Sequence, residues 1–250
     1  MKKEFVNRGV STPRFLPIRT IPEDVDRLTA EVGFPAIIKP DVSAASVGLS
    51  LRSVVFDVGS AAAQVCHLIQ DQQAQGLKAM EVFAERFIDG PEFTIFILAD
   101  RTESLEVRAL PAVQRLFHPD LPPHERFLSH DRYWAEYKKE PRLPGGEPFV
   151  RHALASSNLQ ARLADIAIHA YRAVGGTGYA RVDIRMDAKT PELFVLEVNS
   201  NCELTGDKET SLGEILSLSK LSIHEVVSLI LKDAGERFGM QELAERTSAQ

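Results

Sequence analysis

The chain has 250 residues, of which 44% are hydrophobic and 26% are charged, and its formal net charge is -6. This length allows a substantial core in one large domain or two modest ones. The acidic balance without a long basic run excludes the footprint of a nucleic-acid-binding protein, and no apolar run approaches the roughly 20 residues that cross a membrane.

Two cysteines, Cys66 and Cys202, fit no metal-binding or disulfide pattern. Such usage is typical of a reducing compartment. The first residues form no secretory h-region. The sequence therefore predicts a cytoplasmic protein with no nucleic-acid or membrane partner.

The first elements in chain order are a helix and a strand within "TIPEDVDRLTAEVGFPAIIKP". Pro22 suits the first helical turn, acidic residues follow it, and Gly33 suits the end of the helix. The next predicted helix covers residues 60–75. Strands are expected at residues 80–87 and 93–98, because both runs are rich in aromatic and aliphatic residues.

Two further helices carry capping-box patterns near their starts. Residues 157–174 form a strong helical pattern, with Ser157 and Gln160 at capping-box spacing. Ser222 and Glu225 repeat this spacing before a second amphipathic run. We therefore expect two capped helices in the C-terminal half of the chain.

Residues 114–148, which lie between the predicted strands and these two helices, are rich in proline, histidine and charged residues. This composition indicates a long loop or a mobile lid. Residues after about Gly239 resemble a fraying tail. Because helices and strands intermix and several strands form hairpins, the predicted class is α+β rather than a doubly wound parallel sheet.

A hairpin is predicted in "YARVDIRMDAKTPELFVLEVNSN", residues 179–201, where two strand-like runs flank "AKTP". If the turn is centred near residues 189–190, Asp183 falls nearly opposite Glu197, and like charges so placed destabilise a strand pair. A cation is therefore expected there, and an oxygen set completed by Asn199 suits magnesium. The alternative is a solvent-facing side with scattered charge. Strand alternation assigns Arg181, Asp183, Arg185, Glu197 and Asn199 to the polar face, and Val182, Ile184, Met186, Leu196 and Val198 to the apolar face.

Three earlier stretches are also chemically suggestive. In "GFPAIIKP", Lys39 ends an apolar strand and requires an anionic partner, either a carboxylate or a phosphate. The small residues of "DVSAASVGLS", residues 41–50, can form a loop whose backbone N–H groups close over phosphates. "AERFIDGPEF" places carboxylates at Glu85 and Glu92 around a short apolar link.

In this order, "GFPAIIKP", "SVGLS", "AERFIDGPEFT", "GYARVDIRMD" and "LFVLEVNSN" resemble the motifs of the ATP-grasp superfamily, most closely its D-alanine–D-alanine ligase branch. The similarity runs from about residue 2 to about residue 235. It implies an ATP-grasp fold, with two α+β lobes whose antiparallel sheets grip ATP. The expected lobes are residues 1–88 and 89–238, followed by the tail, 239–250.

The resemblance also implies a role for each matching residue. Phosphates would contact Lys39 and the loop residues Ser46, Val47 and Gly48; adenine would contact Glu85 and the backbone of Arg86, Phe87 and Ile88; and ribose would contact Glu92. Two magnesium ions would be held by Asp183, Glu197 and Asn199. Arg181 would stabilise charge on the transferred phosphoryl group, and acceptor binding would involve Glu203, Ser211 and Leu212.

The implied activity is an ATP-dependent carboxylate–amine ligase that forms an amide or peptide bond through an acyl phosphate. Its substrates would be a small carboxylate and an amine, those of a small amino acid or peptide. The alternatives are an ATP-binding module without turnover and a structural domain that binds nothing. Product analysis separates the first two, because only a ligase yields ADP and a new amide.

The sequence departs from the ligase pattern at four places. It starts just after the position where the family's N-terminal domain ends, so a missing domain or a homo-oligomer is expected to complete the site. The phosphate loop reads "SAASVG", residues 43–48, in place of "EGSSVG". Tyr133 stands where a lid lysine is usual, with Lys138 or Lys139 as possible substitutes. Glu203 replaces a glycine, which favours a cationic acceptor unless the side chain simply faces solvent.

Overall fold

The computed structural model describes residues 1–42, 45–74, 81–100, 106–143 and 148–238. The chain divides into unit 1, residues 1–12, 90–116 and 151–250, and unit 2, residues 13–89 and 117–150. The division between residues 89 and 90 lies beside the expected lobe boundary at 88 and 89, whereas residues 1–12 and 117–150 group with the other unit. The expected tail, 239–250, lies outside the described residues.

Unit 2 is built on a four-stranded antiparallel sheet with the strand order β1-β4-β2-β3. Three α-helices pack on it through a cluster that includes Leu28, Ile38 and Val65. Residues 117–150 add a short α-helix and a 3-10 turn. The elements of this unit are β1 (Phe15–Ile18), α2 (Glu23–Asp26), α3 (Leu28–Glu31), β2 (Ala36–Pro40), η1 (Leu51–Ser53), β3 (Val54–Val55), α4 (Val58–Ala74), β4 (Val82–Arg86), η2 (Pro123–Glu125) and α5 (His130–Tyr133).

The predicted elements of unit 2 are present with local differences. The first predicted helix is split into α2 and α3, and α3 ends at Glu31, two residues before Gly33, which has φ 81° and donates its N–H to the carbonyl of Leu28 at 2.8 Å. Glycine suits this left-handed position because it has no Cβ. The helix predicted at residues 60–75 spans 58–74, and Asp57 caps it by accepting the N–H of Ser60 at 2.7 Å.

Unit 1 contains a six-stranded sheet with the path β10-β9-β5-β7-β8, and β6 pairs with β5 beside β7. The pairs of β5 with β6, β7 and β9, and of β9 with β10, are antiparallel. Among the described residues, no helix is long and apolar enough to cross a membrane. The elements of this unit are α1 (Lys2–Asn7), β5 (Glu92–Asp100), β6 (Glu106–Ala109), β7 (Val113–Phe117), β8 (Val150–Leu154), α6 (Ser157–Ala173), β9 (Tyr179–Met186), β10 (Leu193–Asn199), α7 (Ser211–Ser219) and α8 (Ile223–Arg237).

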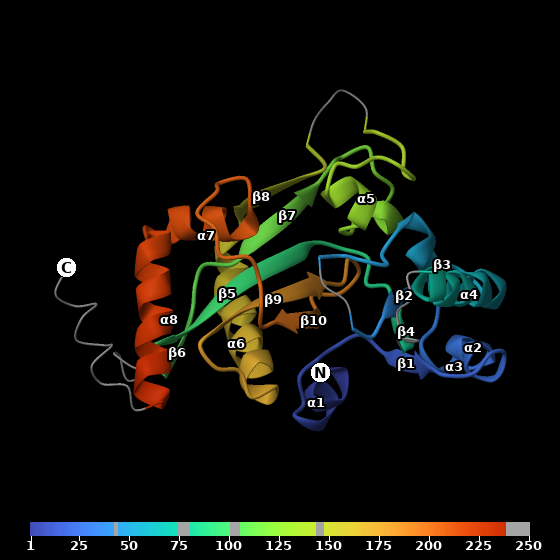
Figure 1. The fold of residues 1–250 in the computed structure, drawn as a ribbon, viewed down its shortest axis with the longest axis horizontal. Helices are drawn as coiled ribbons and strands as arrows, with labels where there is room; N and C mark the ends of the chain where they lie inside the picture. The colour runs from blue at the N-terminus through green and yellow to red at the C-terminus, as the bar shows by residue number, and fades with distance from the viewer. Residues whose placement is uncertain (43–44, 75–80, 101–105, 144–147, 239–250) are drawn as a thin grey trace. The chain divides into compact units, whose positions relative to one another are not determined.

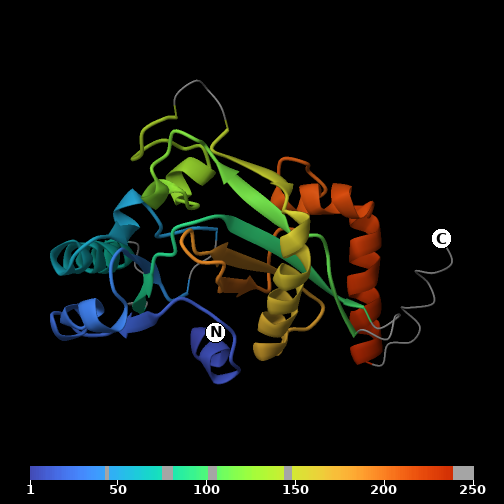
Figure 2. The same ribbon diagram turned by 180° about the vertical axis from the view of Figure 1, so that it is seen from behind.

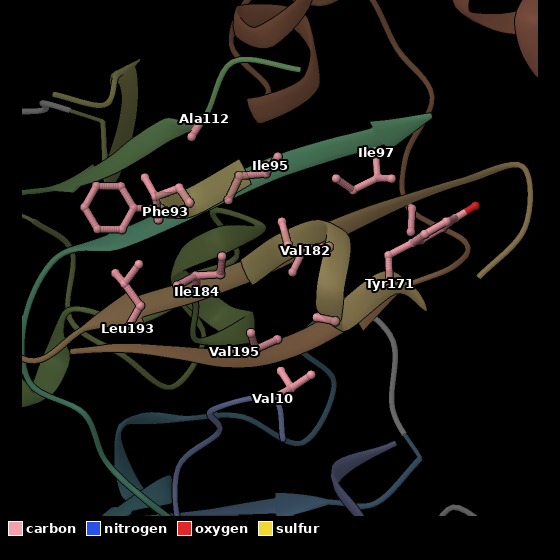
Figure 3. Packing of buried hydrophobic residues seen from close by; sticks show 14 of the residues in the cluster. Val10, Phe93, Ile95, Ile97, Ala112, Tyr171, Val182, Ile184, Leu193 and Val195 are labelled. Carbon is pink, nitrogen blue, oxygen red and sulfur yellow. The ribbon is translucent and has the colours of Figure 1, made fainter. Parts of the chain in front are cut away.

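One face of this sheet carries the main core of unit 1. Phe93, Ile95 and Ile97 alternate along β5 on the same face as Val182 and Ile184 of β9 (Figure 3). The helix α6, yellow in Figure 2, lies across the strands on this face. The main core therefore fixes the alternation of β5 and β9, which turns their polar residues to the other face.

The other face is only partly covered by helices. Phe96 and Leu98 of β5 pack with Ile215 of α7 and Val226 of α8, the orange and red helices of Figure 1. This second cluster covers the C-terminal part of β5. The polar side chains of this face therefore lie near the N-terminal end of β5, around Glu92.

Two capping predictions have opposite outcomes. The box of Ser222 and Glu225 is confirmed, because each side chain bonds the backbone of the other residue. The box predicted from Ser157 and Gln160 is wrong, since the helix is capped at Ser156 without a side-chain bond. The Gln160 amide instead bonds the N–H and carbonyl of Ala112, both at 2.9 Å, and so ties α6 to the start of β7.

The predicted register of the hairpin is confirmed, because Glu197 lies opposite Asp183. The prediction that Leu196 lies on the apolar face is wrong, since Leu196 is the extra residue of a register shift between residues 195 and 197, and Val195 and Val198 pack with the core. The N-terminal segment engages the chain at this shift: the N–H of Val195 donates to Ser11 O at 2.8 Å, and its carbonyl accepts from Thr12 Oγ1 at 2.8 Å. A bulge of this kind re-aims the side chains that follow it.

Candidate functional site

The polar face of the unit 1 sheet brings together residues from four strands. Glu92 of β5 lies opposite both Arg115 of β7 and Arg185 of β9, and Asp183 of β9 lies opposite Glu197 of β10. Opposite residues of antiparallel strands project to the same face. The strand pairing therefore gathers three of the predicted site residues beside two arginines.

Their side chains form a continuous series of ion pairs, Arg185–Glu92–Arg115–Asp183–Arg181, which we call the arginine–carboxylate chain. Arg185 contacts Glu92 Oε2 at 2.8 Å, and Arg115 contacts the other oxygen of Glu92. The second Nη of Arg115 lies 3.2 Å from Asp183 Oδ1, and Arg181 Nη2 lies 3.0 Å from Asp183 Oδ2. The first four of these side chains are nearly fully buried, and Arg181 is 18% exposed.

The arginines keep both buried carboxylates ionised. Burial alone would raise the pKa of Asp183, but the charges of Arg115 and Arg181 lower it well below its usual range. Burial likewise opposes ionisation of Glu92, and Arg185 and Arg115 together lower its pKa. Buried charges are tolerated only when they are paired, as they are here.

His152 of β8 is a further member of this face. The bonds from Ala155 N–H to Ala112 O and from His118 N–H to Phe149 O, both 3.0 Å, place His152 opposite Arg115. Burial, reinforced by the charge of Arg115, lowers the pKa of His152 to about 4. The imidazole is therefore neutral at pH 7.

Sequence reasoning missed Arg115 and His152 as site residues. The signal for Arg115 was present in "VQRLF": alternation puts it in phase with buried Val113, while Leu116 is 43% exposed. An arginine at a core-facing strand position indicates a buried anionic partner. His152 had no comparable signal, because its neighbours come from the pairing of β7 and β8.

Arg181 of β9 also approaches Glu197 of β10, with 3.9 Å between Nη2 and Oε1. The Glu197 side chain is 49% exposed. Asn199 lies opposite Arg181, and its Oδ1 accepts the N–H of Asn201 at 3.0 Å. The cation expected between Asp183 and Glu197 is thus supplied in part by Arg181.

The donor chemistry of this set suits magnesium only in part. Carboxylate and amide oxygens, as in Glu197 and Asn199, are ligands that a hard divalent ion prefers. Asp183, by contrast, is already held by Arg115 and Arg181. Within the described ranges, no three His, Cys, Asp or Glu side chains are grouped so that they could hold a metal ion.

In unit 2, Lys39 of β2 and Glu85 of β4 form an ion pair. Lys39 Nζ lies 2.7 Å from Glu85 Oε1, and their side chains are 21% and 1% exposed. The anionic partner required by Lys39 is thus a carboxylate in this structure. The resemblance implied a phosphate contact for Lys39 and an adenine contact for Glu85. The two residues with these predicted contacts are therefore ion-pair partners in this structure.

The predicted adenine hinge follows directly on β4. The Arg86 N–H donates to Arg14 O at 2.8 Å, and the Phe87 N–H donates to Pro35 O at 3.0 Å. Phe87 and Ile88 are buried, whereas Arg86 is exposed. These bonds hold the backbone of the hinge beside β1 and the turn before β2.

The described part of the predicted phosphate loop begins at Ala45, since residues 43–44 lie outside the described ranges. Ala45 and Ser46 have φ values of 54° and 61°, and Gly48 has φ 83°. Non-glycine residues rarely adopt such values. Val47 is 45% exposed at the tip, and Trp134 Nε1 donates to Ala45 O at 3.1 Å. The loop is therefore held in an unusual conformation by a residue of the predicted lid.

Lys138 and Lys139, the candidate substitutes for the lid lysine, are both bonded through their backbone N–H groups to Asp131. The N–H groups of Lys138 and Lys139 donate to the carboxylate of Asp131, at 2.9 Å and 3.0 Å. The Lys138 side chain is 72% exposed and lies 3.3 Å from Glu136. Tyr133, at the position of the usual lysine, is 36% exposed.

The predicted acceptor residues fall into two environments. Glu203 is exposed, as the alternative interpretation of this residue required. Ser211 and Leu212 begin α7 and are buried, and Leu212 belongs to the second core cluster of unit 1. The side chain of Thr210 caps this helix by accepting the N–H of Gly213 at 3.1 Å. The side chain of Leu212 is therefore part of the core, and any contact with an acceptor would have to come from its backbone.

The sequence matches the family described as "D-ala D-ala ligase C-terminus" over residues 8–212. It is 28% identical to the D-alanine–D-alanine ligase of Methylibium petroleiphilum over 211 residues, which cover 82% of this chain and 57% of the relative. The ligase of the same name from Desulforudis audaxviator is 27% identical over 238 residues, 94% of this chain and 67% of the relative. The chain therefore spans 57% to 67% of the length of these two relatives.

Solved structures of similar proteins share the fold. A D-alanine–D-alanine ligase from Bacillus anthracis gives a TM-score of 0.67 at 18% identity, over 96% of this chain and 67% of that one. A structure of such a ligase from the same organism, complexed with ATP, gives 0.65 at 17% identity, over 96% and 66%. VanG D-Ala:D-Ser ligase from Enterococcus faecalis gives 0.56 at 20% identity, over 79% and 50%. The predicted α+β ATP-grasp fold with antiparallel sheets is confirmed.

Proposed function

Because the chain belongs to the D-ala D-ala ligase C-terminal family, we propose that it binds ATP and catalyses carboxylate–amine ligation. The observation that carries this proposal is the arginine–carboxylate chain next to Glu197 and Asn199. A sheet face with buried, ionised groups beside the more accessible oxygens of Glu197 and Asn199 suits phosphoryl transfer, which relies on positioning and electrostatics. The similar proteins are named as ligases, and one was solved with ATP.

In the proposed reaction, a substrate carboxylate oxygen attacks the γ-phosphorus of ATP, and the bond to the β–γ bridging oxygen breaks. ADP leaves with that oxygen, and an acyl phosphate forms. An amine then attacks the acyl carbon, loses a proton and expels phosphate, which leaves an amide. We propose small amino acids or peptides as the substrates, and a cytoplasmic location, which agrees with the two free thiols.

Unit 1 contributes the charges for this reaction. The guanidinium of Arg181 is 18% exposed and is fixed by Asp183, so it is preorganised to stabilise negative charge on the transferred phosphoryl group. Asp183 acts by orienting Arg181. Magnesium, held by Glu197 and Asn199, would neutralise phosphate charge when bound.

Unit 2 contributes nucleotide contacts. We propose that Lys39 binds phosphate, that the loop from Ser46 to Gly48 closes over it with backbone N–H groups, and that Glu85 with the hinge 86–88 binds adenine. The pairing of Lys39 with Glu85 at 2.7 Å supports this, because one ion pair prepositions a cation and an acceptor on adjacent strands.

An ATP-binding module without turnover is the second candidate. It is favoured by Tyr133, which occupies the position of the usual lid lysine, and by Ala45, which replaces a serine of the phosphate loop. Both changes remove groups that would otherwise contact phosphate. Binding and turnover must therefore be measured separately.

Binding is tested by thermal unfolding with and without ATP and magnesium. A ligand at about 100 times its dissociation constant stabilises the native state by about 2.7 kcal/mol. We expect a magnesium-dependent rise in Tm that Glu197→Ala abolishes, whereas the exposed Glu31→Ala leaves it unchanged. No rise in the wild-type chain at millimolar ATP would contradict the proposal.

A further inference from the structure

We infer that this chain binds one divalent cation with its nucleotide, at Glu197 and Asn199, and that Arg115 replaces a second cation at Asp183. This inference deepens the proposed function and rests on it. The resemblance implied two magnesium ions shared among Asp183, Glu197 and Asn199. The structure divides these residues into a buried part and an exposed part.

Both oxygens of Asp183 contact guanidinium groups. Arg115 Nη2 and Arg181 Nε each lie 3.2 Å from Oδ1, and Arg181 Nη2 and Nε lie 3.0 Å and 3.3 Å from Oδ2. The single N–H of Arg181 Nε is shared between the two oxygens, so three nitrogens occupy most of the roughly four lone-pair positions of the carboxylate. Asp183 is also only 4% exposed, so a metal ligand bond requires the displacement of an arginine.

Arg115 is the arginine that cannot move away. Its side chain is 3% exposed, and its other nitrogen is paired with Glu92. Glu92 is itself fixed by Arg185, whose Nε and Nη2 both lie 2.8 Å from Oε2. Arg181 differs, because it ends the chain of ion pairs and is 18% exposed.

Magnesium requires near-octahedral oxygen ligands at about 2.1 Å and usually retains several waters. A hydrated ion of this kind would reach buried Asp183 only by displacing an arginine, and its charge would repel the fixed guanidinium of Arg115. Glu197 offers the opposite environment, because 49% of its side chain is exposed. Asn199 provides the second oxygen on the same strand face.

The charge balance is consistent with this substitution. The arginine–carboxylate chain contains three arginines and two carboxylates, which gives a net charge of +1 next to Glu197. A permanent positive charge within 3.2 Å of Asp183 already provides the neutralisation that a cation would supply. The site therefore requires only one mobile ion.

The test counts manganese, a paramagnetic substitute for magnesium, per bound nucleotide. The chain is equilibrated with Mn²⁺ and a non-hydrolysable ATP analogue, free Mn²⁺ is measured by electron paramagnetic resonance, and bound nucleotide by absorbance after dialysis. We expect one Mn²⁺ per nucleotide. Two would overturn the inference and leave the proposed function intact. Nucleotide bound without Mn²⁺ would overturn the cation site, and no bound nucleotide would overturn the proposed function together with the inference.

Two matched variants test whether Arg115 is the residue that limits the ratio of Mn²⁺ to nucleotide to one. Arg115→Met removes the fixed charge from Asp183, so we expect the ratio to rise from one to two. Arg185→Met removes another buried arginine of the same chain but no contact with Asp183, so the ratio stays at one. A ratio of one in folded Arg115→Met would refute the role of Arg115. If that variant does not fold, the wild-type ratio still decides the inference.

Discussion

Glu92 is the centre of the arginine–carboxylate chain, and its replacement by glutamine is a sharp test of that structure. The substitution keeps the volume of the side chain but removes the negative charge between Arg115 and Arg185. Both guanidinium groups would then remain buried, with side-chain exposures of 3% and 4%, and Arg185 would lose its ion pair with Glu92.

Removing one partner of a buried ion pair typically costs about 3–5 kcal/mol, because the remaining charge stays out of water. Glu92→Gln should lower the free energy of unfolding by that amount, since its carboxylate is 5% exposed. Glu31→Gln is the matched control. Its partner Arg27 and its own side chain are 52% and 42% exposed, so the expected loss is below about 1 kcal/mol.

The assay is urea denaturation followed by circular dichroism, combined with ATP titration of each folded variant. If the arginine–carboxylate chain holds the buried charges in place, only Glu92→Gln loses much stability. Equal stability of Glu92→Gln and Glu31→Gln would show that the buried ion pairs of Glu92 do not stabilise the fold. A stable Glu92→Gln chain with weakened ATP binding would instead support the ribose contact that the resemblance implied.

Three further predictions concern a partly buried histidine, the predicted phosphate loop and a helix cap. Because the fold lowers the pKa of His152 from 6.5 to about 4, neutral His152 favours the folded state above pH 6.5, and this contribution is lost as the pH falls toward 4. The wild type should therefore lose about 2 kcal/mol more than His152→Gln between pH 7 and pH 5 in urea titrations. Equal losses would contradict the lowered pKa of His152. Trp134→Phe removes a hydrogen bond of about 1 kcal/mol from Ala45, so hydrogen exchange around Ala45 should become about five-fold faster, whereas an unchanged rate would show that Trp134 does not hold the loop. Ser222→Ala should cost about 1 kcal/mol of unfolding free energy, and Ser156→Ala, whose side chain makes no capping bond, should cost much less; equal costs would argue against the cap.

Local sequence patterns predicted the parts of the structure that local geometry determines. The turn in "AKTP" sets the register of the first pairs, from Leu193 with Met186 to Val195 with Ile184, and the shift after Val195 then places Glu197 opposite Asp183. The box of Ser222 and Glu225 is a contact three residues apart, and it formed as expected. In each case the partners are close in sequence, so little depends on the rest of the fold.

Predictions failed where a distant segment competes for the same groups. Gln160 bonds Ala112 in place of the helix start, because the buried backbone groups of Ala112, just before β7, need partners. Leu196 leaves the apolar face at a register shift, and the residue before it, Val195, bonds the distant N-terminal segment. Arg115 became part of the site only through the pairing of β5 with β7, about twenty residues apart in the chain.

The central claim is that the chain transfers a phosphoryl group from ATP to a carboxylate. The most direct test incubates it with ATP, magnesium and a pool of amino acids whose carboxylates carry ¹⁸O, followed by mass spectrometry of the phosphate and amide products. An acyl phosphate leaves one carboxylate oxygen in the released phosphate. We therefore predict ADP, a new amide and phosphate with one ¹⁸O atom. Intact bound ATP, or phosphate without the label, would contradict the claim.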